Sequence, residues 1–552
     1  MLSRARELAR GWRSWAPGAL VGAALLFFVI ENRSVHTPID DAFIFYRYAR
    51  NLAEGHGLVF NVGERVEGFT SLLWTLLVAA GVAAGGNAVA VGHWLGVASG
   101  ALVLVLTYRY AAAGLSAGER VVAALATWLL ALGLPFAVWA TSGLETPLFA
   151  AAIMAALVAE GRGYSGRAVL ASALAVLIRP EGLMLGGVVF AFLFLRSGLR
   201  RRKTFLLLGG YLLFVALLTG FRLAYFGAPL PNTFYAKVGG AMPNWGLLYF
   251  QMFLLQTLLP LVWPSAHAIL DRHLTVGWCW AGCVLVWVFA LGGDAFSFSR
   301  FFVPALPVLC AAAARGVIRA QSKQTAAARF AMLSLPVCGV WYALGTVAGF
   351  AALISAALAS FFRRVGLVGR AALAVLALIF VGAAGFYADR YAKAVVQDQR
   401  PSNFRIVMQL CTARSRFTEL RETRTNWKYF ALASRYIADR LELRPPAKKL
   451  VATVSVGAFG FYSDAKVLDL VGLVDPTIAR SGHPQSKEEV ALPGHQRTNA
   501  AYVLSKNPDY ILIPRPGTAF FPLPPVVEMW NEPELARRYQ YDPEVDGYRR
   551  ID

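Results

Sequence analysis

The fold is decided by residues 18–57, which read GALVGAALLFFVI, ENRSVHTPID and DAFIFYRYARNLAEGHG in three consecutive pieces. The first piece is apolar, as expected of a membrane span, and the last places Phe45, Tyr48 and Leu52 on one face of a helix. Two adjacent carboxylates, Asp40 and Asp41, stand where the amphipathic helix begins. The sequence therefore predicts a membrane helix followed by an outer loop that carries chemically useful groups.

Apolar composition extends this prediction to most of the chain. The protein has 552 residues, of which 57% are hydrophobic, whereas soluble domains hold about 45–50%. Apolar runs recur between residues 18 and 387, and charge density rises beyond 388. We expect an α-helical polytopic membrane protein with a transmembrane domain at 1–387 and a soluble C-terminal α/β domain at 388–552.

The net charge of +21 has two interpretations. Nucleic-acid binding is one, but the basic residues lie in short loops between apolar runs, as the positive-inside rule predicts for a membrane protein. We therefore expect no nucleic-acid partner. The arginines between Arg4 and Arg13 precede the first span, and no cleavage-site pattern follows it. This pattern favours a retained first helix with a cytoplasmic N-terminus.

Topology follows if every basic cluster faces the cytoplasm. The run 71–86 must then not cross the membrane, and the run 330–361 must cross twice or dip and return. This arrangement gives about 11–13 spans, ends the last span at 387 and puts the C-terminal domain outside. The outward connections are 31–70, 139–147, 179–182, 226–245 and 292–300. In the C-terminal domain we expect helices at 403–441 and 500–506 and strands at 450–461, 466–470 and 510–514.

The five cysteines indicate neither a disulfide framework nor a zinc site. Four of them lie in apolar runs, Cys411 alone lies in the soluble part, and none has metal-ligand spacing. The sequence shows no convincing ligand set for any metal, and we expect no cofactor.

Asp40 and Asp41 are the first candidates for catalysis. Either side chain could simply cap the helix that follows. Capping needs only one carboxylate, however, and a neighbouring pair of like charges raises a pKa. A carboxylate held near the lipid headgroups suits a general base that takes a proton from an acceptor hydroxyl.

Further ionisable and polar residues lie in the other outward connections. Each could belong to a structural ion pair or helix cap, as Arg179 with Glu181 illustrates. Their convergence on one side of the bundle predicts a shared polar cavity, because ionisable groups near a membrane are costly and tend to be functional. Arginines there suit a lipid-linked phosphate. The candidates in these connections are Glu145, Arg179, Glu181, Asn232, Tyr235, Lys237, Asp294 and Arg300.

Together these features resemble the membrane glycosyltransferases of the C superfamily (GT-C), which use polyprenyl-phosphate sugars. The helix after Asp41 is laid out like that of the aminoarabinose transferases and the protein mannosyltransferases. Several segments are most similar to the bacterial terminal arabinofuranosyltransferase family of cell-wall synthesis. These segments are 40–73, 142–149, 179–182, 229–237, 292–304, 462–480 and 493–512.

The resemblance assigns roles to individual residues. It implies Asp41 as the catalytic acidic residue with Asp40 beside it, and Glu145 as the second acidic residue, where many relatives have Asp. It implies Arg179, Lys237 and Arg300 as ligands of the donor phosphate. The remaining candidates for substrate contact are His56, Glu67, Glu181, Asn232, Tyr235 and Asp294, although a lone loop histidine such as His56 is more often a surface residue.

The implied reaction is an inverting transfer of a sugar, with arabinofuranose the best candidate. The donor would be a decaprenyl- or undecaprenyl-phosphate sugar, and the acceptor a hydroxyl on a cell-envelope glycan or a surface protein. The implied location is the bacterial plasma membrane, with the site facing outward. A transporter or flippase of lipid-linked sugars is the alternative, but such proteins show internal repeats and the sequence has no evident repeat. A non-catalytic scaffold would not need acids and bases clustered at one membrane face.

Overall fold

The computed structural model is mainly helical and carries a small sheet near its C-terminus. It describes residues 2–33, 38–197, 201–237, 243–294, 298–333 apart from 322, 324 and 326, 337, 352–353, 356, 416–442, 449–484, 497–517 and 523–551.

Four helices in the described part are long and apolar enough to cross a membrane. They comprise α1 (Leu2–Asn32), α4 (Ala88–Ala111), α11 (Arg201–Phe226) and the continuous pair η3 (Arg300–Ala305) and α16 (Leu306–Gln321). The bent pair Ala117–Leu132 and Leu134–Ala140 makes a fifth candidate span when it is counted as one, and five shorter apolar helices accompany these. The chain is therefore a multi-pass membrane protein, as predicted. The expected span at 371–387 and most of 330–361 lie outside the described residues.

The remaining helices of the membrane region are shorter. They are α2 (Asp40–Ala53), α3 (Leu72–Ala83), α5 (Ala117–Ala123), α6 (Leu125–Leu132), α7 (Leu134–Ala140), α8 (Thr146–Gly161), α9 (Ser165–Ile178), α10 (Gly182–Ser197), α12 (Asn232–Lys237), α13 (Pro243–Phe253), η2 (Leu254–Leu258), α14 (Leu259–Ala266) and α15 (Thr275–Leu291).

A sharp bend separates α6 from α7. The two segments meet at 63°, because Gly133 is extended there (ψ 114°) and Pro135 at the start of α7 donates no backbone hydrogen bond. The bend directs the chain into the connection 141–145, which carries Glu145. Gly133 and Pro135 thus set the direction in which the chain enters the connection that carries Glu145.

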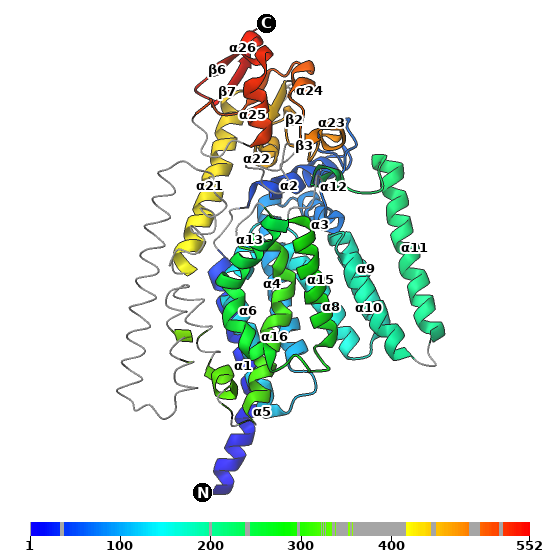
Figure 1. The fold of residues 1–552 in the computed structure, drawn as a ribbon, viewed down its shortest axis with the longest axis vertical. Helices are drawn as coiled ribbons and strands as arrows, with labels where there is room; N and C mark the ends of the chain where they lie inside the picture. Colours follow the sequence, from blue (N-terminus) through cyan, green and yellow to red (C-terminus); the bar gives the residue numbers. More distant parts are fainter. Residues whose placement is uncertain are drawn as a thin grey trace.

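The predicted non-spanning run 71–86 contains the short helix α3. Its 12 residues rise about 18 Å, against a hydrocarbon core of about 30 Å. Ser71 starts the helix by accepting a hydrogen bond from the backbone nitrogen of Trp74. In Figure 1, α3 lies beside α2 near the C-terminal domain, at the end of the bundle away from the N-terminus.

The C-terminal domain is α/β, as predicted. Its main sheet has the order β2-β1-β5-β7-β6, with the first three strands parallel and the last two antiparallel to their neighbours. The strands are β1 (Leu450–Thr453), β2 (Lys466–Asp469), β5 (Tyr510–Leu512), β6 (Tyr539–Asp542) and β7 (Gly547–Arg550), and β3 (His483–Pro484) pairs with β4 (Arg497–Thr498). The helices are α21 (Arg416–Arg440), α22 (Val456–Tyr462), α23 (Pro476–Ser481), α24 (Ala500–Ser505), α25 (Pro524–Asn531) and α26 (Pro533–Arg538).

One predicted strand, 450–461, is wrong in its second half. The strand β1 ends at Thr453, and Val456 begins the helix α22. An apolar run of this length is ambiguous between strand and helix. The choice is made by tertiary contacts, because α22 packs on α2 and its first amides bond to Asp40. The predicted elements at 466–470, 500–506 and 510–514 are confirmed, and 403–415 lies outside the described residues.

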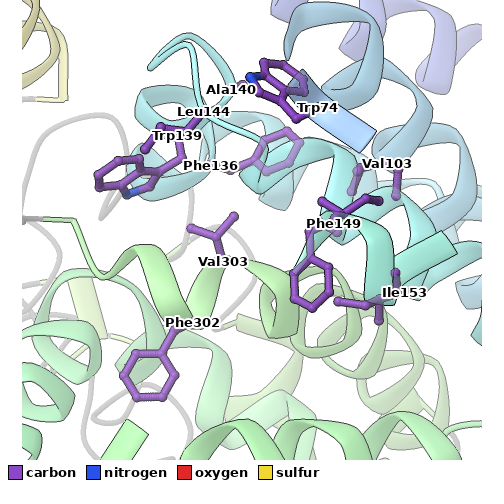
Figure 2. Packing of buried hydrophobic residues seen from close by; sticks show 14 of the residues in the cluster. Trp74, Val103, Phe136, Trp139, Ala140, Leu144, Phe149, Ile153, Phe302 and Val303 are labelled. Carbon is purple, nitrogen blue, oxygen red and sulfur yellow. The ribbon is translucent and has the colours of Figure 1, made fainter. Parts of the chain in front are cut away.

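The helix α21 joins the C-terminal domain to the membrane bundle. Arg424 donates to the side-chain oxygen of Asn32 at 2.8 Å, and the rings of Trp427 and Trp139 lie 6.1 Å apart. Asn32 is the last residue of α1, and Trp139 is the last but one of α7. Below them, apolar side chains from α3, α7, α8 and η3 converge into a buried core, as Figure 2 shows. This core supports the polar connections above it.

Candidate active site

A cavity of about 400 Å³ lies where the connections that carry Asp41, Glu145 and Lys237 meet the C-terminal domain. It collects residues from the five connections that the sequence predicted to share a cavity, and Leu473 of the C-terminal domain is a sixth contributor. Its charged lining residues are Asp41, Glu145, Arg179, Glu181, Lys237, Asp294 and Arg300. Aromatic and aliphatic side chains complete the wall, including Phe45, Phe69, Phe234, Trp287 and Phe301.

Asp41 lies in the first turn of α2 and lines the cavity. Its side chain is 23% exposed, and its Oδ2 lies 3.8 Å from Nη1 of Arg300. The N-cap residue of α2 is Ile39, and no side-chain hydrogen bond caps the helix. The alternative that Asp40 or Asp41 caps its own helix is therefore wrong, and Asp41 is directed to the cavity.

Asp40 points away from the cavity toward the C-terminal domain. Its carboxylate accepts hydrogen bonds from the backbone nitrogens of Ala458 at 2.7 Å and Gly457 at 3.3 Å. These amides belong to the first turn of α22, so Asp40 caps a helix more than 400 residues away in sequence. Burial raises the pKa of Asp40 to about 7, although the two backbone bonds act in the opposite direction.

Arg179 is held between two carboxylates. Its Nη1 lies 2.6 Å from Oε1 of Glu145, and its Nη2 lies 2.7 Å from Oε1 of Glu181. All three side chains are largely buried, and all three line the cavity. The ion pair that the sequence left open for Arg179 and Glu181 is present, with Glu145 as an additional partner.

Arg300 forms a second charged group in the wall. Its Nε lies 2.7 Å from Oδ2 of Asp294, and the guanidinium lies over the rings of Trp139 and Phe301 at 5.4 and 5.2 Å. The preceding residue, Ser299, has left-handed backbone dihedrals (φ 49°), which turn the chain into η3. Arg300 therefore links Asp294 to the neighbourhood of Asp41.

Lys237 differs from these two arginines. It ends α12, is exposed and lines the cavity. Within the described part of the lining, it is the one cation with no carboxylate within 4 Å. The described lining holds four carboxylates and three cations, so its formal charge is −1.

The other predicted substrate contacts lie outside the cavity. Glu67 is buried and accepts from Nε of Arg222 at 3.1 Å. Asn232 donates to the carbonyl oxygens of Gly472 and Leu473, and Arg480 lies 4.9 Å from the Tyr235 ring centroid. His56 is on an exposed loop, and its Nδ1 lies 3.6 Å from Oε2 of Glu54.

Sequence reasoning did not identify Leu473 of the C-terminal domain as part of the site. Leu473 from this domain lines the cavity together with Asp41 and Lys237. No local pattern around Leu473 separates it from an ordinary core leucine. In the described residues, no group of three or more His, Cys, Asp or Glu side chains is placed to hold a metal ion.

A family model and several known proteins are similar to parts of the chain. The family model described as "Domain of unknown function (DUF8728)" matches residues 418–548. Three solved structures are similar at low identity. ArnT from Cupriavidus metallidurans bound to undecaprenyl phosphate is 15% identical, with a TM-score of 0.44 and coverage of 82% of this chain and 85% of that chain.

The other two structures are an arabinosyltransferase and an oligosaccharyltransferase. EmbB from Mycobacterium smegmatis is 17% identical, with a TM-score of 0.41 and coverage of 71% of this chain and 42% of that chain. AglB from Archaeoglobus fulgidus, in complex with an inhibitory peptide and a dolichol-phosphate, is 12% identical, with a TM-score of 0.46 and coverage of 98% and 75%.

Sequence similarity is higher to a terminal β-(1→2)-arabinofuranosyltransferase of Mycobacterium tuberculosis. The two chains are 32% identical over 234 residues, which cover 39% of this chain and 37% of the relative's length. This match confirms the resemblance of the chain to the terminal arabinofuranosyltransferases.

Proposed function

We propose that the protein is an inverting membrane glycosyltransferase. It transfers a sugar, most favourably arabinofuranose, from a polyprenyl-phosphate donor to a hydroxyl of a cell-envelope glycan or surface protein. One observation carries this proposal: a single cavity brings Asp41 together with Lys237 and Arg300 at the end of the bundle beside the C-terminal domain. The relative that is 32% identical supplies the sugar class.

The chemistry follows from these positions. Asp41 takes the proton from the acceptor hydroxyl, and the oxygen forms a bond to the anomeric carbon of the donor. The bond from that carbon to the phosphate oxygen breaks as the new bond forms on the opposite face. The configuration is therefore inverted, and the polyprenyl phosphate leaves with the electron pair.

Cations stabilise the departing phosphate. Lys237 is available without breaking an ion pair, and Arg300 can turn from Asp41, which is 3.8 Å away, toward an incoming phosphate. Arg179 is held by Glu145 and Glu181 and acts mainly by keeping their charges balanced. A phosphate is a good leaving group, so this scheme needs neither a metal nor a separate acid.

The apolar part of the lining suits a lipid-linked donor. Leu183, Phe234 and Leu291 line the cavity and are 45%, 45% and 40% exposed. These residues come from α10, α12 and α15, and their exposed apolar side chains offer a surface for the lipid chain of the donor. The donor lipid enters between these helices while its phosphate reaches Lys237. We place the site on the outer face of the plasma membrane.

Transfer from a synthetic polyprenyl-phosphate arabinofuranose tests this proposal. Purified protein in nanodiscs should form glycosylated product and release polyprenyl phosphate in single-turnover experiments. Asp41→Asn should slow the transfer by about 100- to 10,000-fold while donor binding persists. Asp40→Asn should have a smaller effect, because its carboxylate faces α22, and Glu145→Gln should fall between the two.

Glu54→Gln is the matched control. Glu54 is an exposed carboxylate at the end of the same helix and lies outside the cavity, so its loss should leave the rate unchanged. A rate for Asp41→Asn equal to that of the wild type would remove Asp41 as the base. Absence of transfer from pentose and hexose donors alike would overturn the glycosyltransferase proposal.

A further inference from the structure

We propose that the C-terminal domain is a positioning element of the active site, acting through Arg47 and Asn232. It holds the helix that carries Asp41 and the helix that carries Lys237 at a fixed separation. The roles of Asp41 and Lys237 in this proposal rest on the proposed function. The contacts that support it do not.

Arg47 ties α2 to the C-terminal domain. Its guanidinium donates to the carbonyl oxygens of Gly460 at 2.7 Å and Ala465 at 2.9 Å. It also donates to the carbonyl oxygen of Phe60 at 2.8 Å, and its charge lies 4.4 Å from the Phe60 ring centroid. Arg47 is only 5% exposed, so a planar donor fork joins three backbone segments inside a dry interface.

Backbone packing at the start of α2 leaves no room for movement. A Cβ atom added to Gly457 would lie 1.9 Å from the carbonyl oxygen of Asp40. The backbones of α22 and α2 are therefore in direct contact at the residue that precedes Asp41. The side chain of Asn61 also donates to the carbonyl oxygen of Val467 at 2.9 Å and accepts from its backbone nitrogen at 3.0 Å. The position of Asp41 is thus set by the C-terminal domain as well as by the membrane bundle.

Asn232 ties the opposite wall to the same domain. Its amide donates to the carbonyl oxygens of Gly472 at 2.8 Å and Leu473 at 3.1 Å, and the side chain is buried. Asn232 begins the six-residue helix α12, and Lys237 ends it. A helix this short is stable only when tertiary contacts hold it. The hydrogen bonds of Asn232 therefore fix the helix that presents Lys237.

The loop 470–475 connects the two walls. Leu473 accepts the bond from Asn232 and also lines the cavity between Asp41 and Lys237. On its other side, a Cβ added to Gly68 would lie 2.4 Å from Cγ1 of Val474. The loop touches both the first outer connection and α12, so movement of the domain would change the shape of the cavity.

The first test displaces α2 without altering a charged group. Gly457→Ala should force the backbones of α2 and α22 apart at Asp40 and so displace Asp41. The single-turnover rate should fall by about 100-fold, the loss typical of a displacement near 1 Å. Donor affinity should stay within about twofold, because Lys237 is not on this side. Gly166→Ala is the matched control, since an added Cβ there meets nothing within 4 Å.

Arg47→Lys provides a second variant if Gly457→Ala does not fold. Lysine keeps the charge but cannot reach three carbonyl oxygens at once, so the rate should again fall with donor affinity retained. Combining Arg47→Lys with Asp41→Asn should slow transfer no further than Asp41→Asn alone. Additive losses, or a change in donor affinity in place of rate, would overturn the role of Arg47.

Asn232→Ala tests the opposite wall. It should weaken donor binding by about 5- to 10-fold and leave the rate at saturating donor unchanged. In a double variant with Lys237→Ala, donor binding should equal that of Lys237→Ala alone, because Asn232 acts through Lys237. Independent, additive effects would mean that Asn232 contacts the donor itself.

A distance measurement separates this inference from the proposed function. Spin labels at Phe234 on α12 and Ser481 on α23 should give a narrow distance distribution in the wild-type background. Asn232→Ala should broaden it, whereas Lys466→Ala, which removes only an exposed ion pair with Glu64, should not. A distance distribution that broadens in Asn232→Ala, in a protein whose wild type shows no transferase activity, would support the positioning role and contradict the proposed function. An unchanged distribution would overturn the positioning role.

Discussion

Arg179, Arg300 and Lys237 carry the same charge, but their surroundings give them different tasks. The sequence indicated all three as phosphate ligands and could not show which of them already has partners. Arg179 has two carboxylates within 2.7 Å, and Arg300 lies between Asp294 and Asp41. The partner of a side chain depends on tertiary packing, and these partners come from connections up to about 259 residues away in sequence.

Variants of Arg179 and Lys237 should therefore behave differently. Lys237→Ala should weaken donor binding without changing thermal stability, because the exposed side chain leaves no buried charge behind. Arg179→Ala should lower the free energy of unfolding by about 3–5 kcal/mol, since Glu145 and Glu181 lose their buried partner. Arg179→Lys should be intermediate, because lysine cannot form the two-sided fork.

Thermal unfolding and donor binding in detergent measure the two effects separately. Equal loss of stability in Lys237→Ala and Arg179→Ala would contradict this assignment. A normal unfolding temperature in Arg179→Ala, together with lost donor binding, would return Arg179 to the role of a phosphate ligand.

At the scale of elements, α2 and α22 form the junction that sequence reasoning could least foresee. The amphipathic pattern of α2 was sufficient to predict the helix and its position after the first span. It was not sufficient to predict that Asp40 caps α22, because the amides it binds lie 417 and 418 residues further along the chain. The same contact explains why 456–462 is a helix where the apolar run suggested a strand.

The burial of Asp40 makes the junction between α2 and α22 dependent on pH. Burial raises the pKa of Asp40 to about 7, with smaller contributions in the same direction from Asp41 on its own helix and Asp469 in the C-terminal domain. An unfolded aspartate titrates near 3.9, so the folded state binds the proton more tightly between about pH 4 and pH 7. The contribution of Asp40 to stability therefore decreases as the pH rises through this range and is constant above it.

Hydrogen exchange of the α22 amides at about pH 6 and about pH 8 measures this effect. After correction for intrinsic exchange, protection should be greater at the lower pH in the wild type. Asp40→Asn, which does not ionise, should lose most of this difference while Asp469 retains its own smaller contribution. Equal protection at both values in the wild type would show that Asp40 does not titrate in this range.

At the scale of the whole molecule, charge and hydropathy were sufficient to predict a helical membrane protein with an α/β part near its C-terminus, and to predict that the polar connections gather. The predicted boundary at 387 lies outside the described residues. The connections that carry Asp41, Glu145, Lys237 and Arg300 do meet in one cavity. The placement of the C-terminal domain on the membrane helices was not predictable. It depends on single contacts, such as the hydrogen bonds of Asn61 with the backbone of Val467, and such contacts leave no repeating pattern in the sequence.

Topology can be checked by thiol labelling in intact cells, on a background without the native cysteines. Single cysteines at Ala84 and Ser481 should react with a membrane-impermeant reagent, because both positions are exposed. Ala84 directly follows α3 and Ser481 ends α23, and both helices lie at the end of the bundle that we assign to the outside (Figure 1). A cysteine at Gly166 is exposed in the first turn of α9, the end of that helix away from Arg179 and the cavity, and should react only after permeabilisation. Reaction of Ala84→Cys only after permeabilisation would show that 71–86 crosses the membrane.

The span in sequence between Arg47 and its partners Gly460 and Ala465 is 413 and 418 residues. A ribosome adding about 5–20 residues per second needs roughly 20–80 seconds to cover such a distance. During that interval the membrane helices can be inserted, but the first outer loop has nothing to dock against. The cavity includes Leu473 in its lining, so it cannot be complete before most of the chain has been made. The transfer that we propose therefore requires a chain synthesised at least as far as this segment.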